Sequence, residues 1–212
     1  MSDQKRTLFS RLTTVFILLG PVVDVLTALS EKFLSIPLSL GILVRFAFVG
    51  LIGIYLLFIY KDKHHILIKI FFLIVSAYGV AHILLNAYVF GTSTLFENLK
   101  MFFKTYYFVY TLLFFYALYK DTGFKISDKT LSIVFLEYTA CILVAVLTKT
   151  SFYTYPWRLS EGYCGWFFAG NEVAAVVAGL AFVAVYYAAY RANIFVGIAI
   201  MLLTALDRKS VV

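Results

Sequence analysis

The stretch GYCGWFFAGNEVAAVVAGL, residues 162–180, decides the class of fold. Its second half opens an apolar run that continues to residue 190, close to the roughly 20 residues that a helix needs to cross a bilayer. The run begins with Asn171 and Glu172. Asn is a favoured helix N-cap, and a carboxylate in the first turn is stabilised by the positive end of the helix dipole. We therefore predict a membrane-spanning helix over 172–190, with Asn171 as its cap.

Apolar runs of this kind fill the rest of the chain. Of its 212 residues, 63% are hydrophobic and only 14% are charged, whereas soluble domains carry about 25% charged residues. The composition predicts an all-α, polytopic helical membrane protein with six to seven transmembrane helices in one domain, residues 1–206. The predicted spans are 12–29, 37–60, 66–90, 101–119, 131–148, 172–190 and a short one over 194–206.

Basic residues are divided unequally between the two sides of the predicted membrane. With a cytoplasmic N-terminus, ten Lys and Arg residues lie inside, and five lie outside, namely Lys32, Lys100, Lys104, Lys149 and Arg158. The positive-inside rule therefore predicts a multi-pass protein with a cytoplasmic N-terminus and an outward-facing segment 149–171. The net charge of +7 comes from short clusters between spans, which is typical of orientation signals and indicates no nucleic-acid partner.

Some ionisable residues lie inside the predicted spans. An ionised side chain there costs roughly 3 kcal/mol or more, so it usually faces a partner or a wet cavity. Asp24 and Arg45 are expected in the outer half of the membrane at similar depth. They either line an outward-open cavity in which Arg45 meets an anion, or clamp two helices together, or Arg45 snorkels to the headgroups. Glu137 is interpreted as a proton relay, or as a residue that pairs locally or faces a polar crevice, and His82 with Asn86 as one face of a helix interface.

The segment TYPWRLSEGYCGWFFAGNE places Arg158 among glycines and aromatic residues, just before a helix N-terminus. Free N–H groups at a helix N-terminus together with an arginine form a plausible anion site. Glu172 would oppose an anion there unless it acts as a base or pairs with Arg158. Cys141 falls in a span and Cys164 in a loop, so no disulfide is predicted, and no metal or cofactor motif is present.

Two segments resemble the O-antigen ligase / O-antigen polymerase superfamily of bacterial envelope enzymes. One is GPVVDVLTAL with IPLSLGILVRFAFV, within residues 20–49, which is similar to the amino-terminal Asp-Val-Leu-Thr and arginine-containing span of that family. The other is RLSEGYCGWFFAGNEVAAVVAGL, residues 158–180, which is similar to its arginine–glycine–asparagine signature at a helix start. Together they cover about a quarter of the chain.

The resemblance implies a membrane glycosyltransferase with a GT-C-like fold. Such enzymes move a glycan from undecaprenyl pyrophosphate to an acceptor on the outer face of the plasma membrane, without a nucleotide sugar or an obligatory metal. It also implies that Arg45 and Arg158 hold the pyrophosphate, with Asp24 and Asn171 beside them in the substrate site. Arg158 and Glu172 are the candidate catalytic residues, and a carboxylate or histidine activates the acceptor hydroxyl.

Members of the family have more spans, and a large external loop late in the chain. We therefore interpret this sequence as an amino-terminal fragment, inactive alone, whose last residues 207–212, DRKSVV, are a non-native tail. That hexapeptide is also the translation of GATCGGAAGAGCGTCGTG, a sequencing-adapter string. Two other classes stay open: a transporter or flippase of envelope precursors with an intramembrane charge path, and a non-catalytic membrane partner that assembles through small-residue helix faces.

Overall fold

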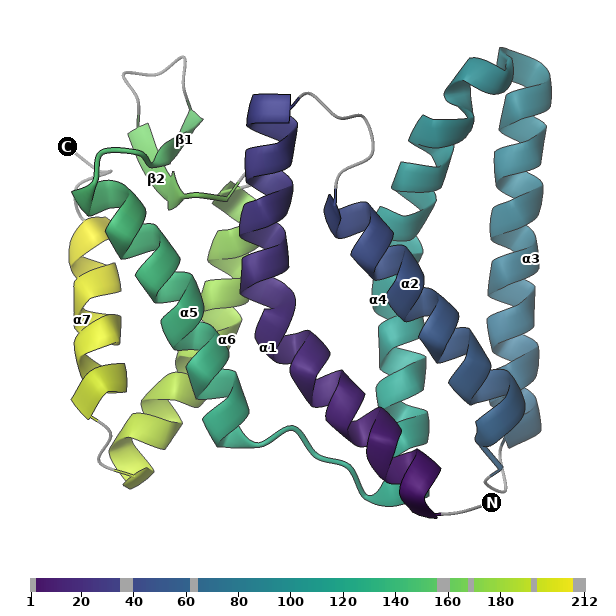
Figure 1. The fold of residues 1–212 in the computed structure, drawn as a ribbon, viewed down its shortest axis with the longest axis horizontal. Helices are drawn as coiled ribbons and strands as arrows, with labels where there is room; N and C mark the ends of the chain where they lie inside the picture. Colours follow the sequence, from purple (N-terminus) through teal and green to yellow (C-terminus); the bar gives the residue numbers. More distant parts are fainter. Residues whose placement is uncertain are drawn as a thin grey trace. The chain divides into compact units, whose positions relative to one another are not determined.

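A computed structural model describes residues 3–34, 40–61, 65–155, 161–167, 170–191 and 194–207. Every predicted span is a helix in this structure, which confirms a polytopic helical membrane protein (Figure 1). Within the described part of the chain, six helices, α1 to α6, are long and apolar enough to cross a membrane. The helices are α1 (Asp3–Leu34), α2 (Leu40–Ile54) with its π-helical extension η1 (Tyr55–Ile59), α3 (His65–Phe90), α4 (Leu95–Thr122) after the 3-10 turn η2 (Thr92–Thr94), α5 (Asp128–Leu147), α6 (Gly170–Arg191) and α7 (Ile194–Asp207).

The connection between α5 and α6 differs from the loop that the sequence predicted. It contains an antiparallel hairpin of β1 (Phe152–Tyr155) and β2 (Glu161–Gly165), with Tyr153 opposite Tyr163. Aromatic residues favour strands because cross-strand aromatic pairs stabilise the ladder, and these two tyrosine rings lie 5.5 Å apart. Helix α6 begins at Gly170, two residues before the predicted start at 172, so Asn171 lies inside the first turn instead of at the cap.

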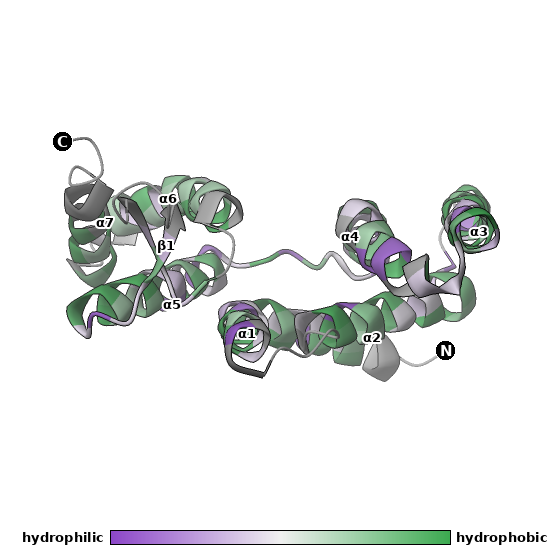
Figure 2. Ribbon diagram, turned by 90° about the horizontal axis from the view of Figure 1, so that it is seen from above, coloured by the Kyte–Doolittle hydropathy of each residue, from purple (hydrophilic) through white to green (hydrophobic). Residues whose placement is uncertain are grey.

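The helices form two compact units. The α2–α4 unit comprises Met1–Ser10 and Leu40–Lys125, and the α5–α7 unit comprises Arg11–Ser39 and Ile126–Val212. Helix α1 therefore contributes its first turns to one unit and the rest of its length to the other. Hydrophobic residues lie on all seven helices (Figure 2), and many of those on α3 are exposed. Exposed apolar side chains along a helix suit contact with lipid, where the helix satisfies its own backbone hydrogen bonds.

Aromatic rings fill the core of the α2–α4 unit. Buried Phe114 of α4 meets Phe48 of α2 and Tyr55 of η1 edge to face, with ring centroids 5.8 and 5.3 Å apart. The Tyr55 hydroxyl donates a 2.9 Å hydrogen bond to Asp121, which gives a buried phenol the polar partner that it needs. On α3, the missing side chain of Gly79 makes room for the ring of Phe102 on α4.

The core of the α5–α7 unit brings α1, α5 and α6 together. Its buried centre is Val134, Tyr138, Ile142 and Phe167. Partly buried residues of α1 and α6 pack against this centre, among them Ile17, Leu18 and Val25 of α1 and Val173, Val177 and Leu180 of α6. Because Phe167 lies in the connection between β2 and α6, the same core also positions the hairpin and the start of α6.

Candidate functional site

The predicted site residues are distributed over both units. Asp24 belongs to the α5–α7 unit and Arg45 to the α2–α4 unit, so their pairing stays a prediction. Asn171 and Glu172 lie in the first turn of α6, whose backbone is described. Arg158 lies in segment 156–160, outside the described residues, between two strands that are paired. The α5–α7 unit thus contains all of the predicted site except Arg45.

Asp24 has a partner that the sequence did not single out. The hydroxyl of Tyr138 on α5 donates a hydrogen bond of 2.7 Å to the Asp24 carboxylate on α1. Tyr138 is buried, and its ring lies against Phe167, with centroids 5.1 Å apart. A short bond to a charged acceptor is among the stronger hydrogen bonds of a protein. The bond therefore joins α1 to α5, and the Tyr138 ring also contacts Phe167 in the connection between β2 and α6.

The hairpin is tied closely to the end of α5. Gly165 has a φ of 65°, and a Cβ atom there would lie 2.8 Å from the Cα of Ile142. Its backbone N–H donates to the Ser151 hydroxyl at 3.1 Å, and the indole N–H of Trp166 donates to Thr150 at 2.8 Å. The buried Cys164 thiol donates to the carbonyl of Phe167 at 3.3 Å. These contacts fix the strands on either side of segment 156–160.

The last turn of α1 reaches the same end of this unit. The ammonium group of Lys32 lies 3.7 Å from the centroid of the Phe152 ring on β1, in cation–π geometry. This end therefore gathers the Lys32 cation, the strands that flank Arg158, and the helix start that carries Asn171 and Glu172. Cations and free helix N–H groups are the elements of an anion site.

The two remaining intramembrane charges have different surroundings. The guanidinium of Arg45 on α2 lies 5.9 Å from the ring centroid of Tyr107 on α4, within cation–π range. One carboxylate oxygen of Glu137 on α5, Oε2, is buried and has no hydrogen bond to any described residue, so this oxygen is not locally paired. In the described ranges no three His, Cys, Asp or Glu side chains gather as a metal site, and Cys141 and Cys164 are both free thiols.

Removing the Tyr138 hydroxyl should weaken the α5–α7 unit. We expect Tyr138→Phe to destabilise the protein by about 1.5–3 kcal/mol, because the Asp24 carboxylate loses a charge-assisted hydrogen bond. The measurement is the thermal midpoint at which a thiol-reactive fluorophore gains access to Cys164, which is buried in the folded protein. Tyr163→Phe is the matched control, because Tyr163 is exposed and lies on the hairpin. Equal midpoints for the two variants would show that the bond to Asp24 adds no stability.

Comparison with known proteins agrees with the helical membrane architecture. It also agrees with the family resemblance carried by residues 20–49 and 158–180. The sequence profile of the family described as O-antigen ligase like membrane protein matches residues 6–211, which is most of the chain. No curated protein and no solved structure matched. The family match extends over both units, and over the helices as well as the hairpin. The chain therefore belongs to the O-antigen ligase-like family of membrane proteins.

Proposed function

We propose that these helices belong to an enzyme that transfers or polymerises a glycan carried on undecaprenyl pyrophosphate, on the outer face of a bacterial plasma membrane. Family membership supports a membrane glycan ligase or polymerase. The observation that carries the proposal is the end of the α5–α7 unit, where Lys32, the paired strands on either side of Arg158 and the start of α6 come together. The carrier pyrophosphate and the glycan acceptor are the substrates, and no cofactor is required.

Charge defines the proposed roles. The pyrophosphate is a multiply charged anion, and arginine offers it a permanent charge with a planar fork of donors. Arg158 binds the pyrophosphate from the hairpin and stabilises it as the leaving group, while Arg45 supplies a second cation. The first N–H groups of α6 and the side chain of Asn171 complete the anion site. Glu172 takes the proton of the acceptor hydroxyl, and Asp24 supports the site through its bond to Tyr138.

The activity is tested with the full-length protein in membranes. Purified lipid-linked glycan and acceptor are added, and the release of glycan from the carrier is followed in time. Transfer that depends on Arg158 supports the proposal. If the protein moves intact lipid-linked glycan across vesicle membranes and transfers none of it, the function is that of a flippase.

The orientation of the protein gives a separate prediction. In a variant without native cysteines, Ser160→Cys should react with a membrane-impermeant maleimide added to intact cells, because the positive-inside rule places segment 149–171 outside. Lys125→Cys, in the exposed connection between α4 and α5, should react only after the cells are opened. Lys125 also lies outside the N-cap of α5, where the Ser127 hydroxyl accepts the Thr130 N–H. The opposite labelling pattern would place the proposed site on the cytoplasmic side.

A further inference from the structure

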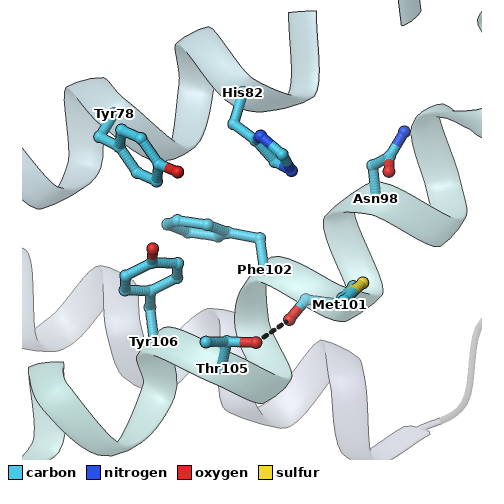
Figure 3. A pocket seen from close by; sticks show the side chains of 7 residues that line it. All are labelled: Tyr78, His82, Asn98, Met101, Phe102, Thr105 and Tyr106. Carbon is cyan, nitrogen blue, oxygen red and sulfur yellow. Dashed lines mark hydrogen bonds between the residues drawn. The ribbon is translucent and has the colours of Figure 1, made fainter. Parts of the chain in front are cut away.

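The α2–α4 unit contains a cavity whose lining includes none of the residues with a role in the proposed reaction. It has a volume of about 170 Å³ and lies between α3 and α4. Tyr78 and His82 project into it from α3, and the other side chains come from α4 (Figure 3). Cavities of roughly 150 Å³ accommodate a single six-membered ring, whereas pockets for drug-sized ligands measure roughly 300–1,000 Å³. The residues on α4 are Asn98, Met101, Phe102, Thr105 and Tyr106.

The aromatic wall of the cavity offers flat apolar faces with hydroxyl groups. The rings of Tyr78 and Tyr106 lie 6.2 Å apart at 63°, and Phe102 packs against Tyr106 at 4.8 Å. Phe102 is held in place because it occupies the space above Gly79, where a larger residue would overlap its ring. The hydroxyls of Tyr78 and Tyr106 make no hydrogen bond to any described residue. A ligand that stacks on these rings also meets two phenolic groups that are available for hydrogen bonds.

The polar wall is an ordered network. The side-chain N–H₂ group of Asn86 donates to Nε2 of His82 at 3.0 Å and to Oδ1 of Asn98 at 3.4 Å. Because the amide nitrogen is only a donor, Nε2 of His82 must be the acceptor, and its ring proton is on Nδ1. His82 also stacks on Tyr78, with interplanar angle 14°. The network holds His82 and Asn98 in fixed orientations and leaves the Nδ1–H of His82 and the amide nitrogen of Asn98 as donors.

We propose that the cavity between α3 and α4 binds one uncharged sugar ring, stacked on Tyr78 and Tyr106 and hydrogen-bonded by His82 and Asn98. Among the side chains that the structure describes, none that lines the cavity is charged, so these residues match neither a phosphate nor a cation. A sugar ring combines apolar C–H faces with several hydroxyls, which suits a site of aromatic faces and unpartnered donors and acceptors. A lipid tail would leave the polar groups without partners, at a cost of about 1–3 kcal/mol for each buried group.

The source of the sugar rests on the proposed function, but its binding does not. It is a ring of either the lipid-linked glycan or the acceptor glycan. The cavity is open to the surface, because Tyr78 is 56% and Met101 69% exposed. The polar network includes Asn98, in the first turns of α4, so the polar wall lies toward the η2 turn that joins α3 to α4. A ring that enters from the headgroup region therefore meets the donors first.

Free sugars test the site without any transfer reaction. The full-length protein in lipid nanodiscs is titrated with uncharged hexoses and N-acetylhexosamines, and saturation-transfer NMR reports binding. We expect the double change Tyr78→Phe with Tyr106→Phe, which keeps both rings, to weaken binding of the preferred sugar about tenfold. Tyr88→Phe is the control, because Tyr88 lies on α3 outside the cavity and is 89% exposed. Unchanged affinity in the double variant would overturn the proposal, and so would no binding of any sugar.

A photo-crosslinker distinguishes the source of the sugar from a lipid or a protein partner. Benzoylphenylalanine replaces Met101 at the cavity or, as the control, Phe108, which is 66% exposed on α4 but lies outside the lining. If the crosslinker at position 101 captures the glycan-bearing carrier more than the crosslinker at 108 does, and more than it captures undecaprenyl pyrophosphate without a glycan, the ring belongs to the donor glycan. Preferential capture of an acceptor glycan assigns it to the acceptor. Equal capture at 101 of the carrier with and without its glycan would overturn the proposed sugar site. A second protein cross-linked at 101 would also overturn it. Arg158→Ala should slow transfer about 10²–10³-fold and leave the binding of free sugars unchanged, so failure of the two proposals can be told apart.

Discussion

Arg158→Ala in the full-length protein is expected to slow glycan transfer by about 10²–10³-fold, which is the usual cost of losing one preorganised donor to a developing negative charge. The leaving pyrophosphate gains negative charge as the glycan bond breaks, and arginine stabilises that charge without a change in its own protonation. Tyr155 and Glu161, which flank the segment 156–160 that contains Arg158, are paired in the hairpin. The measurement is the initial rate of glycan release at equal amounts of membrane-inserted protein.

The identity of the cation matters as well as its charge. Arg158→Lys should recover little activity, because lysine offers a point charge where arginine offers two parallel donors. Lys100→Ala is the control for general loss of external charge, because Lys100 is exposed on α4 and belongs to the other unit. Transfer at the normal rate by Arg158→Ala would remove the hairpin from the proposed mechanism.

Arg45 needs a second variant, because its loss could act through Asp24. Arg45→Ala alone combines the loss of a substrate contact with the loss of a predicted partner for the partly buried Asp24 carboxylate, and removing one member of an ion pair away from water is destabilising. Combining it with Asp24→Asn removes that carboxylate charge. A double variant that folds and stays inactive supports the pyrophosphate role. A double variant that regains both folding and transfer would show that Arg45 is a structural partner.

Gly165→Ala should have the largest effect on the structure of the site. At a φ of 65°, an L-residue costs about 1–2 kcal/mol. The added Cβ would also lie 2.8 Å from the Cα of Ile142, a main-chain atom that cannot rotate away. The hairpin must therefore shift from α5, and Arg158 shifts with it. We expect transfer to fall about 100-fold, the effect that a displacement of 1 Å at a reacting group can have.

The displacement can be measured without the reaction. Cys164 is only 3% exposed, so in a Cys141→Ala background its thiol should be protected in the parent protein and should react with a maleimide at low temperature in Gly165→Ala. Gly179→Ala is the matched control, because a Cβ at Gly179 meets no atom within 4 Å and alanine is favoured over glycine in a helix. A protected Cys164 together with normal transfer in Gly165→Ala would show that the close approach to Ile142 is unimportant.

The sequence by itself was sufficient to predict the membrane-spanning helices and to recognise the family. Each span is a local property, because a run of about 20 apolar residues must satisfy its backbone hydrogen bonds within one helix. The predicted spans 66–90 and 172–190 accordingly lie close to α3 (His65–Phe90) and α6 (Gly170–Arg191). The resemblance carried by residues 20–49 and 158–180 agrees with a family match over residues 6–211. The roles of Arg45, Arg158, Asn171 and Glu172 stay proposals.

Only the tertiary structure showed which side chains meet. Tyr138 lies 114 residues from Asp24 in the chain, and no periodicity distinguishes it from the other tyrosines of the spans. The hairpin was predicted as a loop because its pairing depends on docking against α5, where Gly165 approaches the backbone of Ile142. The cavity at Tyr78 and Tyr106 likewise arises from the packing of two helices. Local hydropathy predicts where a helix crosses the membrane, whereas its contacts depend on the rotation and approach of neighbouring helices, which are set by side chains distant in the sequence.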